Sequence, residues 1–151
     1  MSALWDRLPL PAEHVVGVLA TLALQHRTPQ RRLPPAVAAG GWPLIAAGAA
    51  LNGWAVLARG AGDLERPDRL VTDGPHAFTR NPMYLGWSLM HVGLGIWLRS
   101  PWVLASWPIS FALVHRGVLR EERRLAYQFD QAFTDYQEQV ARYWGLPRRG
   151  T

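Results

Sequence analysis

The 151-residue chain contains no cysteine and no lysine, and only 18% of its residues are charged. Without cysteine, the chain has no disulfide bond, no thiolate metal site and no cysteine nucleophile. Sixteen arginines against eleven acidic residues give a formal net charge of +5. Because the arginines do not form one stripe along the chain, we attribute their exclusive use to coding bias. We therefore expect no nucleic-acid partner and no metal.

Long apolar runs dominate what is present. Residues 36–58 contain no charged side chain, which is enough helix to cross a hydrocarbon core of about 30 Å. Two further runs, 83–98 and 101–114, are separated only by Arg99-Ser100, and eight tryptophans suit the aromatic belts at membrane interfaces. The pattern predicts an all-α integral membrane protein, a bundle within one membrane domain over residues 1–151. Its four transmembrane helices are expected at about 8–25, 36–58, 82–98 and 101–119.

The first of these predicted spans carries the weakest signal, since Glu13 and His14 interrupt it. A cleaved signal peptide over residues 1–24 is the alternative interpretation. Such a peptide begins with a positive region, but here Asp6 cancels Arg7. We therefore expect a retained transmembrane helix.

The distribution of arginine predicts how the chain crosses the membrane. With four spans and a cytoplasmic N-terminus, twelve of the sixteen arginines lie inside, and only Arg27, Arg31, Arg32 and Arg99 lie outside. Arginine is enriched in cytoplasmic loops. We expect a multi-pass protein of the cell (inner) membrane, with both termini and the loop before residue 82 in the cytoplasm.

Polar and small residues share one face of the third predicted span. At about 100° per residue, Tyr84, Ser88, His91 and Gly95 fall on one stripe. Polar groups on an apolar membrane helix point into the bundle, where they can line a cavity or serve packing and hydrogen bonding. Both interpretations stay open. We interpret Gly93-Leu94-Gly95 as a close-packing site, because no strand precedes it as in a phosphate-binding loop.

Beyond the fourth span, apolar side chains recur at helical spacing, at Leu125, Phe129, Phe133, Tyr136, Val140 and Tyr143. They predict an amphipathic helix over about 120–144 at the cytosolic interface. If this helix continues unbroken from the fourth span, Glu122 faces the apolar stripe and needs a cationic partner. A structural pair with Arg116 or Arg120 is one interpretation of that glutamate.

The most informative segment is Gly-Pro-His-Ala-Phe-Thr-Arg-Asn-Pro-Met-Tyr-Leu-Gly at residues 74–86, followed 35 residues later by Glu121-Glu122. The two apolar runs between them are joined by a two-residue turn, so we expect antiparallel neighbouring helices. The hairpin then brings both glutamates back to the membrane face that carries Arg80, Asn81 and Tyr84. Polar and charged groups gathered at the open end of an apolar hairpin indicate a site.

These motifs, with the tail Leu125, Phe129, Phe133 and Tyr136, resemble the isoprenylcysteine carboxyl methyltransferase and phospholipid methyltransferase group. The resemblance covers about residues 68–140. Members of this group are small integral membrane enzymes that use S-adenosylmethionine. The resemblance therefore implies a membrane methyltransferase with this cofactor, whose partners are the lipid bilayer and a lipid or small-molecule methyl acceptor.

The resemblance also implies site residues. The cofactor contacts of the group map onto Asp68, Arg69, Leu70, Val71, His76, Asn81, Pro82, Met83, Tyr84 and Glu121. We assign the catalytic positions to Arg80, Arg116 and Glu122; Arg116 lies near the place of a substrate-carboxylate arginine, although Gly117 aligns more closely. Two departures affect the exact hydrogen bonds, because Asn81 replaces a more usual histidine and His76 stands where the group often has tyrosine.

In chemical terms, Glu121 suits the cofactor ammonium, the Asn81 amide its polar edges, and Tyr84 or His76 its ring or ribose. Methyl transfer needs little acid–base help when the acceptor is a carboxylate, thiolate or neutral amine. Two other functions are weighed against this one. A membrane NADPH-dependent reductase of the sterol-reductase type shares a similar hairpin but is usually longer, and a non-catalytic small membrane protein would use its Arg–Glu pairs only to cap a bundle.

Overall fold

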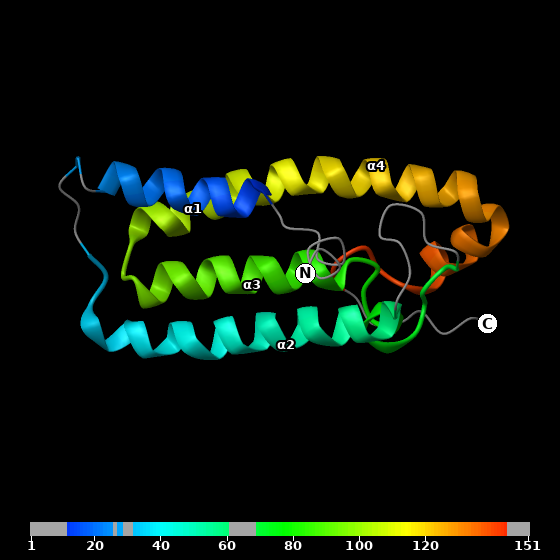
Figure 1. The fold of residues 1–151 in the computed structure, drawn as a ribbon, viewed down its shortest axis with the longest axis horizontal. Coiled ribbons are helices and arrows are strands. Elements are labelled where there is room, and N and C mark those ends of the chain that lie inside the picture. The colour runs from blue at the N-terminus through cyan, green and yellow to red at the C-terminus, as the bar shows by residue number, and fades with distance from the viewer. Residues whose placement is uncertain (1–11, 26, 29–31, 61–68, 145–151) are drawn as a thin grey trace, which may run out of the picture. The chain divides into compact units, whose positions relative to one another are not determined.

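The computed structural model describes residues 12–25, 27–28, 32–60 and 69–144 (Figure 1). Its helices are α1 (Ala12–Gln25), η2 (Pro35–Gly40), α2 (Gly41–Arg59), η3 (Gly74–Ala77), α3 (Pro82–Trp97) and α4 (Pro101–Gln139). The described residues contain no strand, so the prediction of a helical fold is confirmed. Both helices of the predicted hairpin begin at proline, whose fixed φ suits the first helical position.

Two helical segments are long and apolar enough to cross a membrane by length and composition, Pro35–Arg59 and Pro101–Gln139. In the most apolar part of each segment, only 22% and 28% of the residues are buried. Helix α1 is apolar but shorter. The number of membrane crossings remains a prediction.

The chain divides into two compact units. The hairpin unit comprises residues 11–50 and 84–116, and the motif unit comprises residues 51–83 and 117–151, each within its described residues. The motif unit holds the sequence around Arg80 together with Glu121 and Glu122.

Glycines let α2 and α3 approach closely in the hairpin unit. A Cβ atom on Gly48 would lie 2.4 Å from the carbonyl oxygen of Gly86, and one on Gly41 would lie 2.5 Å from that of Gly93. On the other side of α3, a Cβ on Gly95 would lie 2.6 Å from Leu104 Cδ2. These contacts confirm the interpretation of small residues as close-packing sites.

Buried polar side chains join α1 to the hairpin. The Nδ1 atoms of His14 and His91 lie 2.9 Å apart, and His91 Nε2 lies 3.0 Å from both the Val103 carbonyl and Ser106 Oγ. Ser106 Oγ also donates to the same carbonyl. The polar stripe of α3 therefore faces the interior, as predicted.

Helix α4 does not run unbroken to the end of the predicted amphipathic segment. Asp130 has φ 43° and ψ −118°, which separates two helical stretches inside α4, and the last part of the helix turns back (Figure 1). Phe133, Tyr136 and Val140 after the break are buried against Leu125 and Phe129 before it, among others. The amphipathic segment predicted over about 120–144 is therefore not one continuous helix, because its apolar stripe packs against itself across the break and α4 ends at Gln139.

Candidate active site

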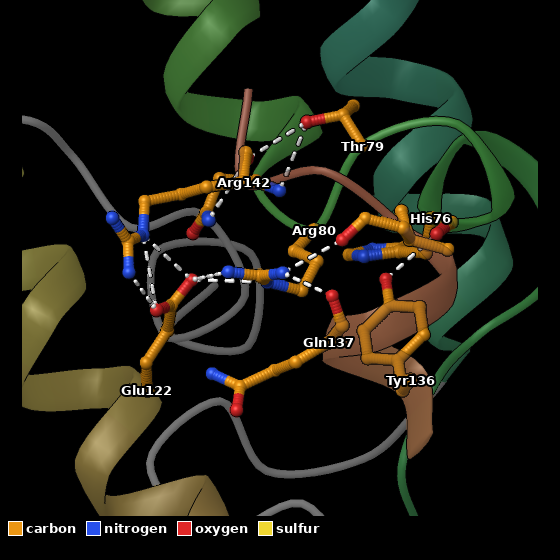
Figure 2. A network of polar contacts seen from close by, with 9 residues as sticks. His76, Thr79, Arg80, Glu122, Tyr136, Gln137 and Arg142 are labelled. Carbon is orange, nitrogen blue, oxygen red and sulfur yellow. Dashed lines mark hydrogen bonds and ion pairs between the residues drawn. The ribbon is translucent and has the colours of Figure 1, made fainter. Parts of the chain in front are cut away.

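Arg80 and Glu122 form the centre of the motif unit. Arg80 Nε and Nη2 each donate to Glu122 Oε1 at 3.1 Å (Figure 2). The two side chains are 9% and 8% exposed, so the pair is removed from water. Arg80 Nη1 donates to the carbonyl oxygens of Gln137 and Val140. The sequence prediction that the hairpin brings Arg80 to the glutamates is thus met for Glu122.

Arg142 completes the neutralisation of Glu122. Its Nε lies 3.1 and 3.0 Å from the two carboxylate oxygens, and its Nη2 donates to Oε2 at 2.8 Å. Burial works to raise the pKa of Glu122, but the hydrogen bonds and charges of Arg142 and Arg80 outweigh it and lower that pKa. The interaction in turn raises the pKa of Arg142. Neither Arg116 nor Arg120, the partners suggested by sequence, makes this pair.

The segment that follows α4 is held to the loop before α3 by hydrogen bonds to its backbone carbonyls. Thr79 Oγ1 and Asn81 Nδ2 both donate to the carbonyl of Arg142, at 3.0 and 3.2 Å, and the Arg80 amide donates to that of Ala141 at 3.0 Å. Three consecutive residues of the loop therefore hold the chain beside Glu122. Figure 2 shows Thr79 and Arg80 on either side of Arg142.

His76 lies buried in the same unit, within η3. Its backbone carbonyl accepts a 2.6 Å hydrogen bond from the Tyr136 hydroxyl, whose pKa burial raises. Burial, followed by the charge of Arg59, lowers the pKa of His76 to about 4, so the imidazole is neutral near pH 7. Its Nε2 is buried and makes no hydrogen bond with any described residue. A neutral ring nitrogen held at this position can hydrogen-bond a hydroxyl or amino group of a ligand.

Glu121 differs from its neighbour in burial and partners. Glu121 lies one helical position before Glu122. Its side chain is 33% exposed, and its Oε1 lies 3.9 Å from Arg59 Nη2. At the outer limit of an ion pair and partly in water, such a contact stabilises weakly. Glu121 is therefore better placed than Glu122 to exchange its interactions for those of a ligand.

The remaining predicted site residues are distributed as follows. Pro82 and Met83 are buried in the motif unit, while Leu70 and Val71 are half-buried there and Arg69 is exposed, donating to the Ala58 carbonyl. Tyr84, half-buried, and Arg116, exposed, belong to the hairpin unit. Asp68 lies outside the described residues. The cofactor and catalytic roles of all these residues remain predictions.

The sequence analysis missed the contributions of Arg142, Arg59 and Thr79, and placed Tyr136 in an apolar stripe and in the tail motif without a hydrogen-bond partner. Arg142 reaches Glu122 because the chain reverses near Asp130, where no glycine or proline marks a turn. The spacing of Tyr136 correctly predicted that this side chain is buried, but it did not predict that the hydroxyl donates to the His76 carbonyl. A search for a cation to match buried Glu122 would have included Arg142, although helical spacing favoured Arg116 and Arg120.

Comparison with known proteins places these residues in a family. The profile of the phospholipid methyltransferase family matches residues 37–132. A protein-S-isoprenylcysteine O-methyltransferase of Tribolium castaneum is 34% identical over 79 residues, covering 52% of this chain and 27% of that protein. The nickel-cobalt-cadmium resistance protein NccN of Alcaligenes xylosoxydans xylosoxydans is 36% identical over 67 residues, 44% of this chain and 32% of its own length. The cobalt-zinc-cadmium resistance protein CzcN of Cupriavidus metallidurans is 40% identical over 68 residues, with shares of 44% and 31%.

The matched part of the chain thus corresponds to about a third or less of each of these relatives. The family match, in contrast, extends over more than half of the chain and includes η3, the start of α3, and both glutamates of α4. The chain belongs to the phospholipid methyltransferase family.

Proposed function

We propose that the protein is an integral membrane methyltransferase that transfers a methyl group from S-adenosylmethionine to a lipophilic or small acceptor. The observation that carries this proposal is the family match over residues 37–132, which includes Arg80 and Glu122 of the buried cluster that Arg142 completes. The family and the isoprenylcysteine methyltransferase relative favour a methyltransferase over the reductase considered from sequence.

The residues of the motif unit fit the cofactor's chemistry. S-adenosylmethionine presents a cationic amino group and sulfonium, a carboxylate, and an adenosine with hydroxyl and amino groups. Glu121 offers a partly exposed carboxylate for the ammonium, and Arg59 beside it offers a cation for the carboxylate. The buried Nε2 of His76, which has no hydrogen-bond partner among the described residues, offers a neutral hydrogen-bonding group to the adenosine. When bound, the cofactor supplies an electrophilic methyl group.

Arg80 and Glu122 are assigned a positioning role within this proposal. Arg80 directs Nε, Nη1 and Nη2 to Glu122 and to two backbone carbonyls, and these four hydrogen bonds use four of its five N–H donors. Glu122 accepts from both arginines, and its lowered pKa keeps it ionised. Arg80 thereby joins the loop before α3, which follows His76, both to the part of α4 that carries Glu121 and Glu122 and to the end of that helix.

The chain's contribution to the reaction is then mainly orientation and exclusion of water. A methyl transfer to an ionised carboxylate, a thiolate or a neutral amine requires no general base, so reacting atoms held in line account for much of the rate. An acceptor carboxylate, lipid amine or thiol are all consistent with the site. Arg116 stays a proposed contact to an acceptor carboxylate by resemblance alone.

The proposed setting is the cell membrane. Two apolar, largely exposed segments support insertion. The arginine distribution supports a multi-pass arrangement with both termini and the motif unit on the cytoplasmic side. Reporter fusions after residue 10 and at Thr151 are expected to report the cytoplasm at both points, and a report of opposite sides would contradict the four-span arrangement.

Thermal stability with and without ligand tests the cofactor. Binding to the native state alone stabilises by RT ln(1 + [L]/Kd), about 2.7 kcal/mol at a hundredfold excess over Kd. In detergent, S-adenosylmethionine or S-adenosylhomocysteine should raise the Tm of the purified protein by an amount that corresponds to a stabilisation of this order. NADPH at the same concentration is the control. A shift with NADPH and none with either S-adenosyl ligand would refute the proposal in favour of a reductase.

A further inference from the structure

The outer face of α4 in the motif unit carries a group of arginines that the proposed site does not use. Arg120, Arg123, Arg124 and Tyr127 are all exposed, and Tyr127 is 93% exposed. At about 100° per residue, these four positions fall within an arc of about 100° on one side of the helix. We call this set the arginine face.

The charge on this face is not neutralised by the acids beside it in sequence. Within Arg-Glu-Glu-Arg-Arg at residues 120–124, Glu122 is buried between Arg80 and Arg142, and Glu121 turns to Arg59. None of the three arginines of the face makes a side-chain ion pair or hydrogen bond with any described residue. Folding therefore separates a nearly balanced stretch of sequence into a neutralised inner side and a cationic outer side.

We propose that the arginine face binds the phosphate groups of anionic membrane lipids. Charge complementarity supports this ligand, because guanidinium groups pair with phosphate in a bidentate manner. The position in the chain supports the source, because the face follows directly on the apolar, largely exposed part of the same long helix that qualifies as a span. An exposed tyrosine beside basic residues suits the headgroup region, where its ring contacts lipid and its hydroxyl contacts water.

This inference rests on membrane insertion as proposed above and goes beyond methyl transfer. An anionic leaflet would attract the face and hold the motif unit at the level of the headgroups. The affinity for anionic lipid should depend on the arginine charge and fall with increasing salt. Affinity for the cofactor should not depend on it, since no residue of the face belongs to the proposed cofactor site.

Lipid selectivity of the purified protein tests the proposal. The apparent Kd values of phosphatidylglycerol and phosphatidylcholine are measured in detergent by native mass spectrometry, for the wild type and for Arg123→Gln/Arg124→Gln. We expect the wild type to prefer phosphatidylglycerol. The double variant should lose about thirtyfold in that affinity, equivalent to about 1 kcal/mol per arginine, with the phosphatidylcholine affinity unchanged. Arg123→Lys/Arg124→Lys should lose less affinity than the glutamine variant, because the charge remains while the bidentate geometry is lost.

Arg27→Gln/Arg32→Gln is the matched control, since it removes two exposed arginines from the segment between α1 and α2. This control should bind phosphatidylglycerol within about twofold of the wild type. Equal losses in both glutamine variants, or none in Arg123→Gln/Arg124→Gln, would overturn the proposal. Tighter binding of a single-stranded oligonucleotide than of phosphatidylglycerol would also overturn it. If one of these results were found while Arg123→Gln/Arg124→Gln still showed the wild-type Tm shift with S-adenosylhomocysteine, the lipid proposal would have failed and the cofactor proposal would stand.

Discussion

Substituting Glu122 by glutamine should separate a structural carboxylate from a ligand-binding one. The carboxylate is 8% exposed and accepts hydrogen bonds from Arg80 and Arg142, so it neutralises charge inside the motif unit. Glutamine has nearly the same size but carries no charge and only one acceptor oxygen. Glu122→Gln therefore leaves two guanidinium groups facing a neutral amide.

The cost follows from the burial of the two arginines. Removing one member of a buried ion pair destabilises by about 3–5 kcal/mol. Arg142 is 35% exposed and can turn partly to water. Arg80 is only 9% exposed but keeps its hydrogen bonds to backbone carbonyls. Both features favour the lower end of this range. At about 2–4 °C per kcal/mol for a chain of this size, we expect Tm to fall by roughly 6–12 °C.

The neighbouring Glu121→Gln should show the opposite pattern. Its pair with Arg59 spans 3.9 Å with both side chains near a third exposed, which contributes about 0–1 kcal/mol. Tm should therefore change by less than about 4 °C. If Glu121 meets the cofactor ammonium, losing a charge-assisted hydrogen bond costs about 1.5–3 kcal/mol, or roughly ten- to a hundredfold in Kd.

Both quantities are measured on the same preparations, as apo Tm in detergent and as Kd for S-adenosylhomocysteine from tryptophan fluorescence. Glu138→Gln removes one exposed acid from the end of α4 and serves as the control for net charge. The reasoning is refuted if Glu122→Gln melts like the wild type. An early-melting Glu121→Gln that binds cofactor normally would remove Glu121 from the site.

Three further predictions concern individual contacts. The pKa of His76 is lowered to about 4, so between pH 6.5 and pH 4 the unfolded chain binds a proton that the native state excludes. The free energy of unfolding should therefore fall by up to about 3 kcal/mol over this range, and the Tm of His76→Gln should depend less on pH than that of the wild type. Gly48→Ala places a Cβ 2.4 Å from a backbone oxygen of α3 and should cost about 1–3 kcal/mol, whereas Gly53→Ala meets nothing within 4 Å and should be neutral or stabilising in the same melt. Tyr136→Phe leaves the His76 carbonyl without its 2.6 Å donor and should lower the unfolding free energy by about 1–3 kcal/mol, and an unchanged Tm would contradict that contact.

The helices and the meeting of Arg80 with Glu122 were predictable because they depend on local rules. Proline at the first position fixes where α3 and α4 begin, and an apolar run sets their length. Two helices joined at Arg99-Ser100 have to run antiparallel, so residues 42 apart in sequence come within 3.1 Å. No information beyond periodicity and loop length was needed for that contact.

The break at Asp130 was not predictable from the same rules. The apolar spacing of Phe129, Phe133 and Tyr136 continues across it without interruption, so helical periodicity alone gives one straight helix. Aspartate tolerates positive φ better than most residues, but it occurs in helices too often to mark a turn. Because Arg142 reaches Glu122 only through this reversal, the second cation of the cluster was missed with it.

The contrast between Glu121 and Glu122 follows from one step along a helix. A rotation of about 100° places Glu122 on the inner side, in line with buried Val118, and leaves Glu121 at the border with water. One further step of that size reaches the outer side, where Arg123 lies exposed beside Arg120 and Arg124. Residues 121, 122 and 123 thus meet boundary, protein and solvent in succession. For that reason the two glutamates should not substitute for each other. Glu122→Ala, with Glu121 retained, should release the segment around Arg142 from α4. A ligand bound at Glu121 cannot restore the charge balance that Glu122 provides in the interior.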